Sequence, residues 1–200
     1  MTNFSTIRET CRLCNSSSLS KLYDMPSSQP VDGFRSVGSS LLDLPKFSMD
    51  LYICDSCNHV QLLTVVDPNL LFGTYIYTSS SSPDLLSHFK SYRDYLLPYF
   101  LAFDSPSLLD IGCNDGLFLN QFINENISLF GIDPAPNIAD CFHDSKINFV
   151  NSYCSDQSLS EFNGSKQPTF DIITANNVFS HSDDLPGLLA TVVKYLSPNG

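Results

Sequence analysis

The stretch Leu108-Leu-Asp-Ile-Gly-Cys-Asn-Asp-Gly116 decides the fold. Its apolar first part, residues 108–111, predicts a buried strand. Gly112 and Gly116 then bracket a tight turn, and residues 117–122 are expected to open a helix. Strand, glycine turn and helix in this order are typical of the nucleoside-binding corner of a doubly wound α/β sheet, where the glycines let a ligand approach the backbone.

The spacing within the turn separates two kinds of nucleotide site. The dinucleotide pattern Gly-x-Gly-x-x-Gly is absent, and the loop instead reads Asp110-x-Gly112-x-Asn114-x-Gly116. This spacing resembles the Asp-x-Gly-x-Gly-x-Gly loop of class I S-adenosylmethionine (SAM) methyltransferases, with Asn114 in place of the middle glycine. SAM carries a sulfonium and no pyrophosphate, so a leading acidic residue suits it better than an anion cradle does. The alternative is a purely structural corner with a helix-capping Asp.

Further strands and helices alternate after this corner. A strand over residues 129–132 ends in Asp133, which is placed to grip two ribose hydroxyls. Later segments predict strands over 147–150 and 170–175, a weak helix over 135–145 and an amphipathic helix over 185–196. The alternation predicts an α/β fold with a parallel, right-handed, Rossmann-like methyltransferase sheet that is incomplete. Ligands of such sheets bind at the carboxyl ends of the strands. The cofactor is therefore expected at Asp110, Gly112, Asn114, Gly116, Asp133, Pro134, Ser152 and Asn176.

Composition narrows the classes of partner. The 200 residues carry a formal net charge of −11 and no run of Lys or Arg, which disfavours nucleic acid and anionic membranes. An RNA methyltransferase with a zinc-ribbon reader is the hypothesis most weakened by this charge. No 18-residue apolar stretch occurs, and the N-terminus lacks a signal-peptide core, so a cytoplasmic chain is expected.

Four of the seven cysteines form two Cys-x-x-Cys knuckles, Cys11-Arg-Leu-Cys14 and Cys54-Asp-Ser-Cys57. Two knuckles complete a closed tetrahedral site, which favours structural zinc over catalysis, with rubredoxin-like iron as the chemical alternative. A redox pair is disfavoured because the segment between the knuckles reads as turns and short strands with too little core to fold unaided. The other cysteines, at positions 113, 141 and 154, are expected to be small packing residues.

Between the knuckles and the glycine turn lies a segment rich in Tyr and Ser, residues 73–82, which could cover the cofactor or serve as a linker. A helix is expected from Pro83 to about residue 97, with Ser82 as its N-cap and Pro98 ending or kinking it. We therefore expect a zinc-binding domain over 1–66, a covering segment and helix over 67–106, and a SAM-binding domain over 107–200.

The ordered set of motifs resembles the sugar C-methyltransferase family, which acts on nucleotide-linked deoxysugars. The motifs are the two knuckles, Tyr75-Ile-Tyr77-Thr-Ser-Ser80, the loop 110–116, Gly131-Ile-Asp-Pro134 and Asn176-Asn-Val-Phe-Ser-His181. The resemblance implies methylation of a carbon beside a keto group through an enolate, with a small-molecule substrate and neither nucleic acid nor membrane as partner. It also implies His181 as the acid/base or enolate contact, with Tyr77 and then Tyr75 reaching in from the covering segment.

The chain departs from that family in two places. Ser152-Tyr153 stands where members commonly carry an Asp-Phe pair that contacts adenine. Leu196-Ser-Pro-Asn-Gly200 is a turn that normally feeds a fifth strand, so a truncated product or fragment is expected. The alternative to an active enzyme is accordingly a non-catalytic SAM- and zinc-binding fragment that needs further residues or a partner chain.

Overall fold

The computed structural model describes residues 4–30, 45–72, 77–142, 146–162 and 168–200. The chain divides into two compact units. The cysteine unit comprises residues 1–76 together with Asp183–Pro186, and the sheet unit comprises Tyr77–Ser182 and Gly187–Gly200. The sheet unit contains a parallel sheet, whereas the cysteine unit contains small antiparallel sheets.

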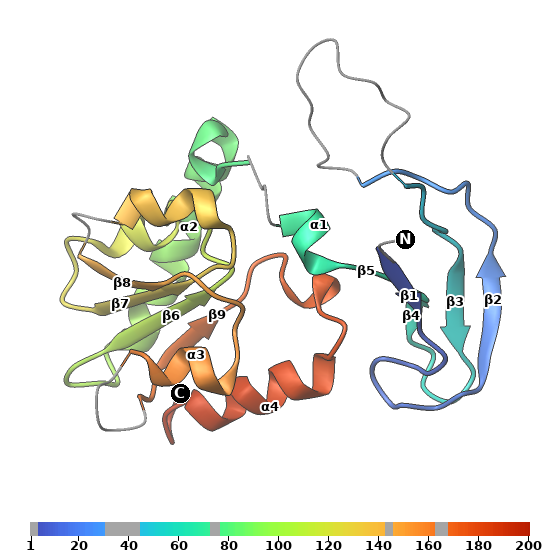
Figure 1. Ribbon diagram of the computed structural model, residues 1–200. Coiled ribbons are helices and arrows are strands. Elements are labelled where there is room, and N and C mark those ends of the chain that lie inside the picture. The colour runs from blue at the N-terminus through green and yellow to red at the C-terminus, as the bar shows by residue number, and fades with distance from the viewer. Residues whose placement is uncertain (1–3, 31–44, 73–76, 143–145, 163–167) are drawn as a thin grey trace, which may run out of the picture. The chain divides into compact units, whose positions relative to one another are not determined.

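The sheet unit contains a parallel sheet of four strands, drawn as neighbouring arrows in Figure 1. They are β6 (Ser107–Ile111), β7 (Ser128–Ile132), β8 (Ile147–Val150) and β9 (Ile172–Thr174), in the spatial order β8-β7-β6-β9. The chain moves outward from β6 to β8 and then crosses to the other side of β6. This reversal confirms the predicted Rossmann-like sheet and places its topological switch point beside β6.

Apolar side chains cover both faces of β6. Leu108 packs into one cluster with residues of α2 (Pro83–Phe100), whereas Leu109 packs into a second cluster with Tyr195 of α4 (Leu185–Tyr195). Both leucines are fully buried. Successive strand residues point to opposite faces, so a central strand buried on both sides must be apolar throughout, as the run 108–111 is apart from Asp110.

Helix α2 begins as predicted and ends later than predicted. The Ser82 hydroxyl accepts a hydrogen bond from Leu85 N at 3.3 Å, and Pro83 occupies the first turn. The helix continues through Pro98 to Phe100, so the expected end near residue 97 is wrong. Pro98 lies in the last turn, and its carbonyl still accepts from the backbone N–H of the C-cap residue. Burial of Phe100 favours the extra turn.

Several connections differ from the predicted helices and strands. The helix expected over 117–122 is a short 3-10 turn, η3 (Leu119–Phe122), and the one expected over 135–145 is the 3-10 segment η4 (Pro136–Phe142). The fourth strand is shorter than 170–175, because Phe170 instead bridges to Leu196. A short helix, α3 (Asp156–Ser160), was not predicted; Ser155 and Ser158 cap it reciprocally.

The cysteine unit consists of two small antiparallel sheets. One pairs β1 (Ser5–Ile7) with β5 (Thr64–Val66). The other has the order β2-β3-β4, formed by Leu19–Tyr23, Leu51–Cys54 and Val60–Leu62, and α1 (Pro68–Phe72) follows β5. Among its described residues, the buried ones are Cys11, Phe47, Cys54 and Gln61.

The three cysteines outside the knuckles do not share one environment. Cys113 is buried and Cys154 is partly buried, but Cys141 is exposed, so the expectation that it packs is wrong. It lies near the end of η4, whose inward positions are taken by Ile138 and Phe142. Within the described ranges, no helix is both long and apolar enough to cross a membrane.

Candidate active site and metal centre

The two Cys-x-x-Cys knuckles meet in one cluster. The sulfur atoms of Cys11, Cys14, Cys54 and Cys57 all lie within 4.8 Å of one another. Cys11 Sγ lies 3.7 Å from Cys57 Sγ, and Cys14 Sγ lies 3.6 Å from Cys54 Sγ. A zinc ion with Zn–S bonds of about 2.3 Å needs tetrahedral S–S edges of about 3.8 Å. Two of the S–S edges match this value, and the four thiols together fit a closed structural zinc site.

Both knuckles close with the same backbone turn. Asn15 and Asn58 follow the second cysteine of each knuckle and adopt φ values of 59° and 62°. Asn15 N donates to Cys11 O at 2.9 Å, and Asn58 N donates to Cys54 O at 2.8 Å. Asn tolerates this left-handed conformation better than most residues. The repeated Cys-x-x-Cys-Asn was a sequence signal for this turn, and the sequence analysis missed it.

Polar hydrogens near Cys11 and Cys54 favour thiolate at these two positions, whereas burial and the neighbouring thiols raise the pKa of Cys57 to about 12. Leu13 N lies 3.4 Å from Cys11 Sγ as a donor. Desolvation raises the pKa of Cys54. Hydrogen bonds from the backbone N–H groups of Ser56 and Cys57 and from the neighbouring thiols lower it by more, so that the pKa is about 6. Because zinc binds thiolate and not thiol, this environment suits a metal ligand.

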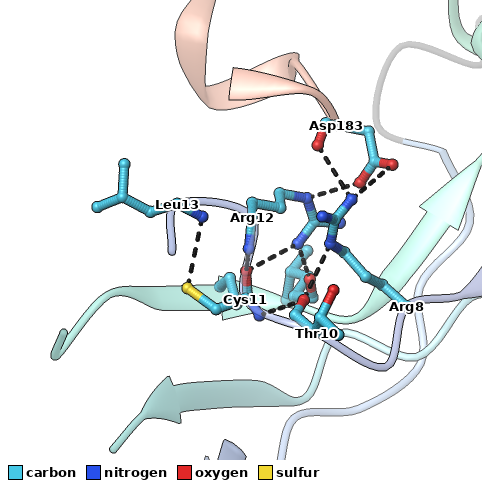
Figure 2. Close-up of polar contacts among 8 residues, drawn as sticks. Arg8, Thr10, Cys11, Arg12, Leu13 and Asp183 are labelled. Carbon is cyan, nitrogen blue, oxygen red and sulfur yellow. Dashed lines mark hydrogen bonds and ion pairs between the residues drawn. The ribbon is translucent and has the colours of Figure 1, made fainter. Parts of the chain in front are cut away.

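Two arginines beside the first knuckle grip one carboxylate of the cysteine unit (Figure 2). Arg12 Nε lies 2.9 Å from Asp183 Oδ1, and Arg8 Nη1 lies 3.1 Å from Asp183 Oδ2. Arg12 also donates to Leu62 O, and its backbone N–H donates to Gln61 Oε1 at 2.9 Å. Arg12 therefore connects the knuckle, β4 and the segment Asp183–Pro186.

In the sheet unit, the glycine turn follows β6 directly. Gly112 has φ +70°, and its N–H donates to Ile132 O at 2.8 Å. A Cβ at this position would lie 2.5 Å from a methyl carbon of Val178, so a side chain there is excluded by both space and conformation. The turn consequently brings the backbone after β6 close to the segment after β9.

Asp133 lies at the end of β7 and is held by two backbone donors. Asn114 N donates to its Oδ2 and Ala135 N to its Oδ1, each at 2.9 Å. Only 8% of the residue is exposed, and burial raises the pKa of its carboxyl group. Each oxygen retains a lone pair, so the fixed carboxylate can still accept hydrogen bonds from a ligand.

Asp110 is the more deeply buried of the two acids, at 3% exposed. Its Oδ1 accepts a hydrogen bond from Thr174 Oγ1 at 2.7 Å. Burial, with a contribution from the charge of Asp133, raises the pKa of Asp110 to about 7. Burial raises the pKa of both acids, and a cationic ligand would stabilise their charged forms. SAM carries such cations, a sulfonium and an ammonium group.

An unsatisfied donor lies at the same edge of the sheet. Asn176 follows β9, and its side-chain amide is polar enough and close enough to lower the pKa of Asp110, by less than burial raises it. Its Nδ2 is nevertheless buried and completes no hydrogen bond of ordinary geometry with the described residues. A buried amide nitrogen without an acceptor is costly, so it suits a ligand that brings one, as the carboxylate or ribose oxygens of SAM would. The residues present therefore fit the cofactor.

The glycine turn also holds the beginning of the described covering segment. Asn114 Nδ2 donates to Tyr77 O at 3.0 Å, and Asn114 Oδ1 accepts from Ser79 N at 2.9 Å. Asp115 Oδ2 accepts from Ser80 N at 2.9 Å. Tyr77 is thus brought to the cofactor loop through its main chain. Tyr75, the other tyrosine of the prediction, lies outside the described residues.

The remaining predicted residues follow strand ends. His181 is the last residue of the 3-10 turn η5 (Phe179–His181) after β9, and it is exposed. Ser152 follows β8, and its N–H donates to Val150 O at 3.1 Å. Pro134 directly follows Asp133 and is partly buried. The roles of these residues, like those of the other predicted site residues, stay predictions.

Two residues that support the site were not predicted from the sequence. Thr174 is the hydrogen-bond partner of Asp110. Asn151 Nδ2 donates at 2.8 Å to both Asp133 O and Ala135 O, which ties the loop after β7 to the end of β8. A polar residue at the end of an apolar strand was the available signal in both cases.

Comparison with known families assigns both parts of the chain. Residues 86–200, more than half of the chain, match the family described as "Methyltransferase domain". Residues 11–72 match the family described as "Putative zinc binding domain". The second match covers all four clustered cysteines and supports zinc as the metal that they fit.

Individual relatives span different chemistries. The chain is 24% identical to the C-methyltransferase NovU of Streptomyces niveus over 154 residues, 77% of this chain and 36% of NovU. It is 33% identical to a ubiquinone biosynthesis O-methyltransferase of Rhodopseudomonas palustris (strain BisB5) over 96 residues, 46% of this chain and 36% of that protein. The chain therefore spans about a third of the length of the curated relatives it matches.

Solved structures of methyltransferases also match. The plantazolicin methyltransferase BpumL, in complex with a desmethylPZN analog and SAH, aligns at 25% identity and a TM-score of 0.44, covering 56% of this chain and 44% of that one. The plantazolicin methyltransferase BamL aligns at 21% identity and a TM-score of 0.46, covering 60% and 45%.

Proposed function

Because the chain belongs to the methyltransferase domain family, we propose that it binds SAM at the carboxyl edge of its sheet and supports methylation of a carbon in a nucleotide-linked keto-deoxysugar. The observation that carries the proposal is the pair of buried acids, Asp110 and Asp133, beside the unsatisfied amide of Asn176. The C-methyltransferase among the relatives and the ordered motifs of the sequence support the choice of a carbon acceptor.

The proposed division of labour follows from position. Asp133 accepts hydrogen bonds from the ribose hydroxyls, and Asp110 supplies negative charge beneath the cationic part of the ligand. The backbone of the turn from Gly112 to Gly116 gives the ligand close approach. Pro134, Ser152 and Asn176 complete the proposed binding set. When bound, SAM supplies an electrophilic methyl group on a sulfonium.

The acceptor carbon must become nucleophilic before it can take a methyl group. In the proposed reaction His181 accepts a proton from the carbon beside the keto group, and the electron pair of that C–H bond moves toward the keto oxygen. Tyr77, with Tyr75 as the second candidate, donates a hydrogen bond to that oxygen, where negative charge develops. These assignments rest on the resemblance in sequence and on two positions in the fold. Tyr77 lies next to the glycine turn, and His181 follows β9.

The chain length favours a second candidate function. Because the chain spans about a third of its curated relatives, it could bind SAM and zinc and take its remaining acid/base residues from further sequence or from a partner. We propose small-molecule substrates for either case, with no nucleic acid or membrane, and a cytoplasmic setting that suits cysteines that form no disulfide. We also propose a zinc-binding domain over 1–66, a covering segment and helix over 67–106 and a SAM-binding domain over 107–200.

Calorimetric titration of SAM into the 200-residue chain tests the cofactor site. We expect Asp133→Ala to weaken binding at least about tenfold, since charge-assisted hydrogen bonds are worth about 1.5–3 kcal/mol. Asp133→Asn is the isosteric second variant, and Asp104→Ala removes an exposed carboxylate as a matched control. If a folded wild-type chain binds no SAM, the cofactor assignment is wrong.

Transfer of labelled methyl from SAM to a keto-sugar nucleotide then separates the two candidate functions. Turnover by the chain that His181→Ala abolishes, with SAM affinity unchanged, would identify an active enzyme. Binding of SAM without turnover, restored when a longer chain of the same gene is used, would identify a fragment that needs further residues.

A further inference from the structure

One residue, Asn114, joins the acid at the end of β7 to the covering segment. Its backbone N–H donates to Asp133 Oδ2 at 2.9 Å, while its side-chain amide bonds Tyr77 O and Ser79 N. The residue is 8% exposed, so these hydrogen bonds are made away from solvent. We propose that Asn114 is a positioning residue that couples cofactor binding at Asp133 to the placement of Tyr77 and the segment after it.

The conformation of Asn114 supports this role. The residue has φ +49°, a left-handed conformation that glycine would adopt at lower cost. Glycine has no side chain and could not bond the covering segment. Asn is among the residues that tolerate this conformation, and its amide supplies one donor and one acceptor at once. The replacement of the middle glycine of the turn is therefore explained by the two hydrogen bonds that it adds.

The neighbouring residue strengthens the connection. Asp115 Oδ2 accepts from Ser80 N at 2.9 Å, next to the bond that Ser79 N makes to Asn114. Ser79 and Ser80 open the 3-10 turn η2 (Ser79–Ser81), whose first N–H groups have no partner within the turn. Side chains of the glycine turn thus cap η2 from a site 35 residues away in sequence.

The connection predicts reciprocal effects. A ligand that fixes the Asp133 carboxylate also fixes the backbone of Asn114, and through its amide the main chain of Tyr77. By linkage, the factor by which ligand binding stabilises the covering segment equals the factor by which the ordered segment strengthens ligand binding. The inference rests on the proposed function, because it takes Asp133 to be a cofactor ligand. It adds that ligand binding at Asp133 and the placement of Tyr77 stabilise each other.

Ser79→Pro is a selective way to break the path. Proline removes the Ser79 N–H, and the first position of a short helix suits its fixed φ. The preceding residue, Thr78, already has φ −116° and ψ 132°, the extended conformation that a following proline requires. Ser79→Ala keeps the N–H and is the matched control. Asn114→Gly removes the amide from the other side while keeping the left-handed backbone.

Hydrogen–deuterium exchange of the peptide spanning residues 77–82, with and without S-adenosylhomocysteine (SAH), is the measurement. We expect SAH to slow exchange there by about fivefold in the wild type and in Ser79→Ala, the effect of about one hydrogen bond. In Ser79→Pro and Asn114→Gly this protection should disappear. SAH affinity measured by calorimetry should fall by the same factor, whereas a purely structural role would speed exchange equally with and without SAH.

The outcomes separate the inference from the function it rests on. Equal SAH protection in the wild type, Ser79→Pro and Asn114→Gly, with SAH bound in all, would overturn the positioning role alone. Absence of SAH binding by the folded wild type would overturn the cofactor assignment and the coupling together, and would appear before any variant is compared. Melting curves of each variant identify one that fails to fold, and in that case the other variant decides.

Discussion

The two units of this chain obtain their stability in different ways. In the described part of the cysteine unit, the buried residues are two cysteines of the cluster, Cys11 and Cys54, with Phe47 and Gln61. The sheet unit instead has apolar clusters on both faces of its sheet, with fully buried side chains such as Leu108, Leu109 and Phe122. The comparison teaches that metal and apolar burial are alternative sources of folding free energy within one chain.

Loss of the metal should produce the largest effect. Cys54→Ser removes a buried ligand, and structural zinc supplies on the order of 10 kcal/mol in small domains. We expect zinc content near zero by elemental analysis and rapid proteolysis of residues 1–76, while the sheet unit stays resistant. Cys154→Ser, outside the cluster, is the control. A protease-resistant cysteine unit without metal would contradict the comparison.

A cavity in the apolar cluster should destabilise the sheet unit and leave the cysteine unit intact. Phe122 is fully buried and lies edge-on to Phe100 and Phe118, with ring centroids 5.9 and 5.3 Å away. Phe122→Ala should lower the free energy of unfolding of the sheet unit by about 3–5 kcal/mol, measured by denaturant titration. Zinc content should stay at the wild-type value. Leu101→Ala removes an exposed apolar side chain and should cost less than about 0.5 kcal/mol.

The buried acid of the sheet unit should make its stability depend on pH. Burial raises the pKa of Asp110 from 3.8 to about 7, so between about pH 4 and pH 7 the folded state holds a proton that the unfolded state releases. Stability therefore falls as pH rises through this window. SAM affinity should rise over the same window, because the cation favours the carboxylate. Asp110→Asn should flatten the dependence of Tm on pH, and an unchanged slope would show that another group titrates.

A surface ion pair should have the smallest effect. Lys194 pairs with Asp156 across α4 and α3, and both side chains are largely exposed. Lys194→Met should change the free energy of unfolding by about 0.5 kcal/mol or less, since such pairs are screened by water and salt. Thermal melts at low and high salt measure this. A larger loss would mean that the sheet unit depends on surface charge as well as on its core.

Sequence predicted the parts of the fold that local patterns determine. The alternation of strand and helix patterns was enough to predict the parallel sheet. The glycine turn after residue 111 and the acid at Asp133 were enough to predict which edge holds the candidate site. The spacing of the knuckles predicted the four-sulfur cluster. Each of these depends on neighbours in sequence, namely a strand period, a turn or a pair of thiols separated by two residues.

The rest depends on contacts between distant segments. Phe170 leaves β9 because it bridges Leu196 and is fully buried, which no local pattern shows. Asn114 looked like a departure from a glycine pattern. Its hydrogen bonds to Tyr77 and Ser79 are visible only once the fold brings together residues 37 and 35 positions apart. The exposure of Cys141 likewise follows from which face of η4 is turned inward.

The carboxylate of Asp183 has a consequence for dissecting the chain. Although it lies more than 170 positions after Arg8 and Arg12, it belongs to their compact unit and forms an ion pair with each of them. The chain therefore leaves the sheet unit for four residues and returns, so no single cut separates the two units cleanly. A gene fragment that stops at residue 76 would express the zinc module with two arginines lacking their counter-ion. Recombination that exchanges the module would have to carry a short insert from the other half of the gene.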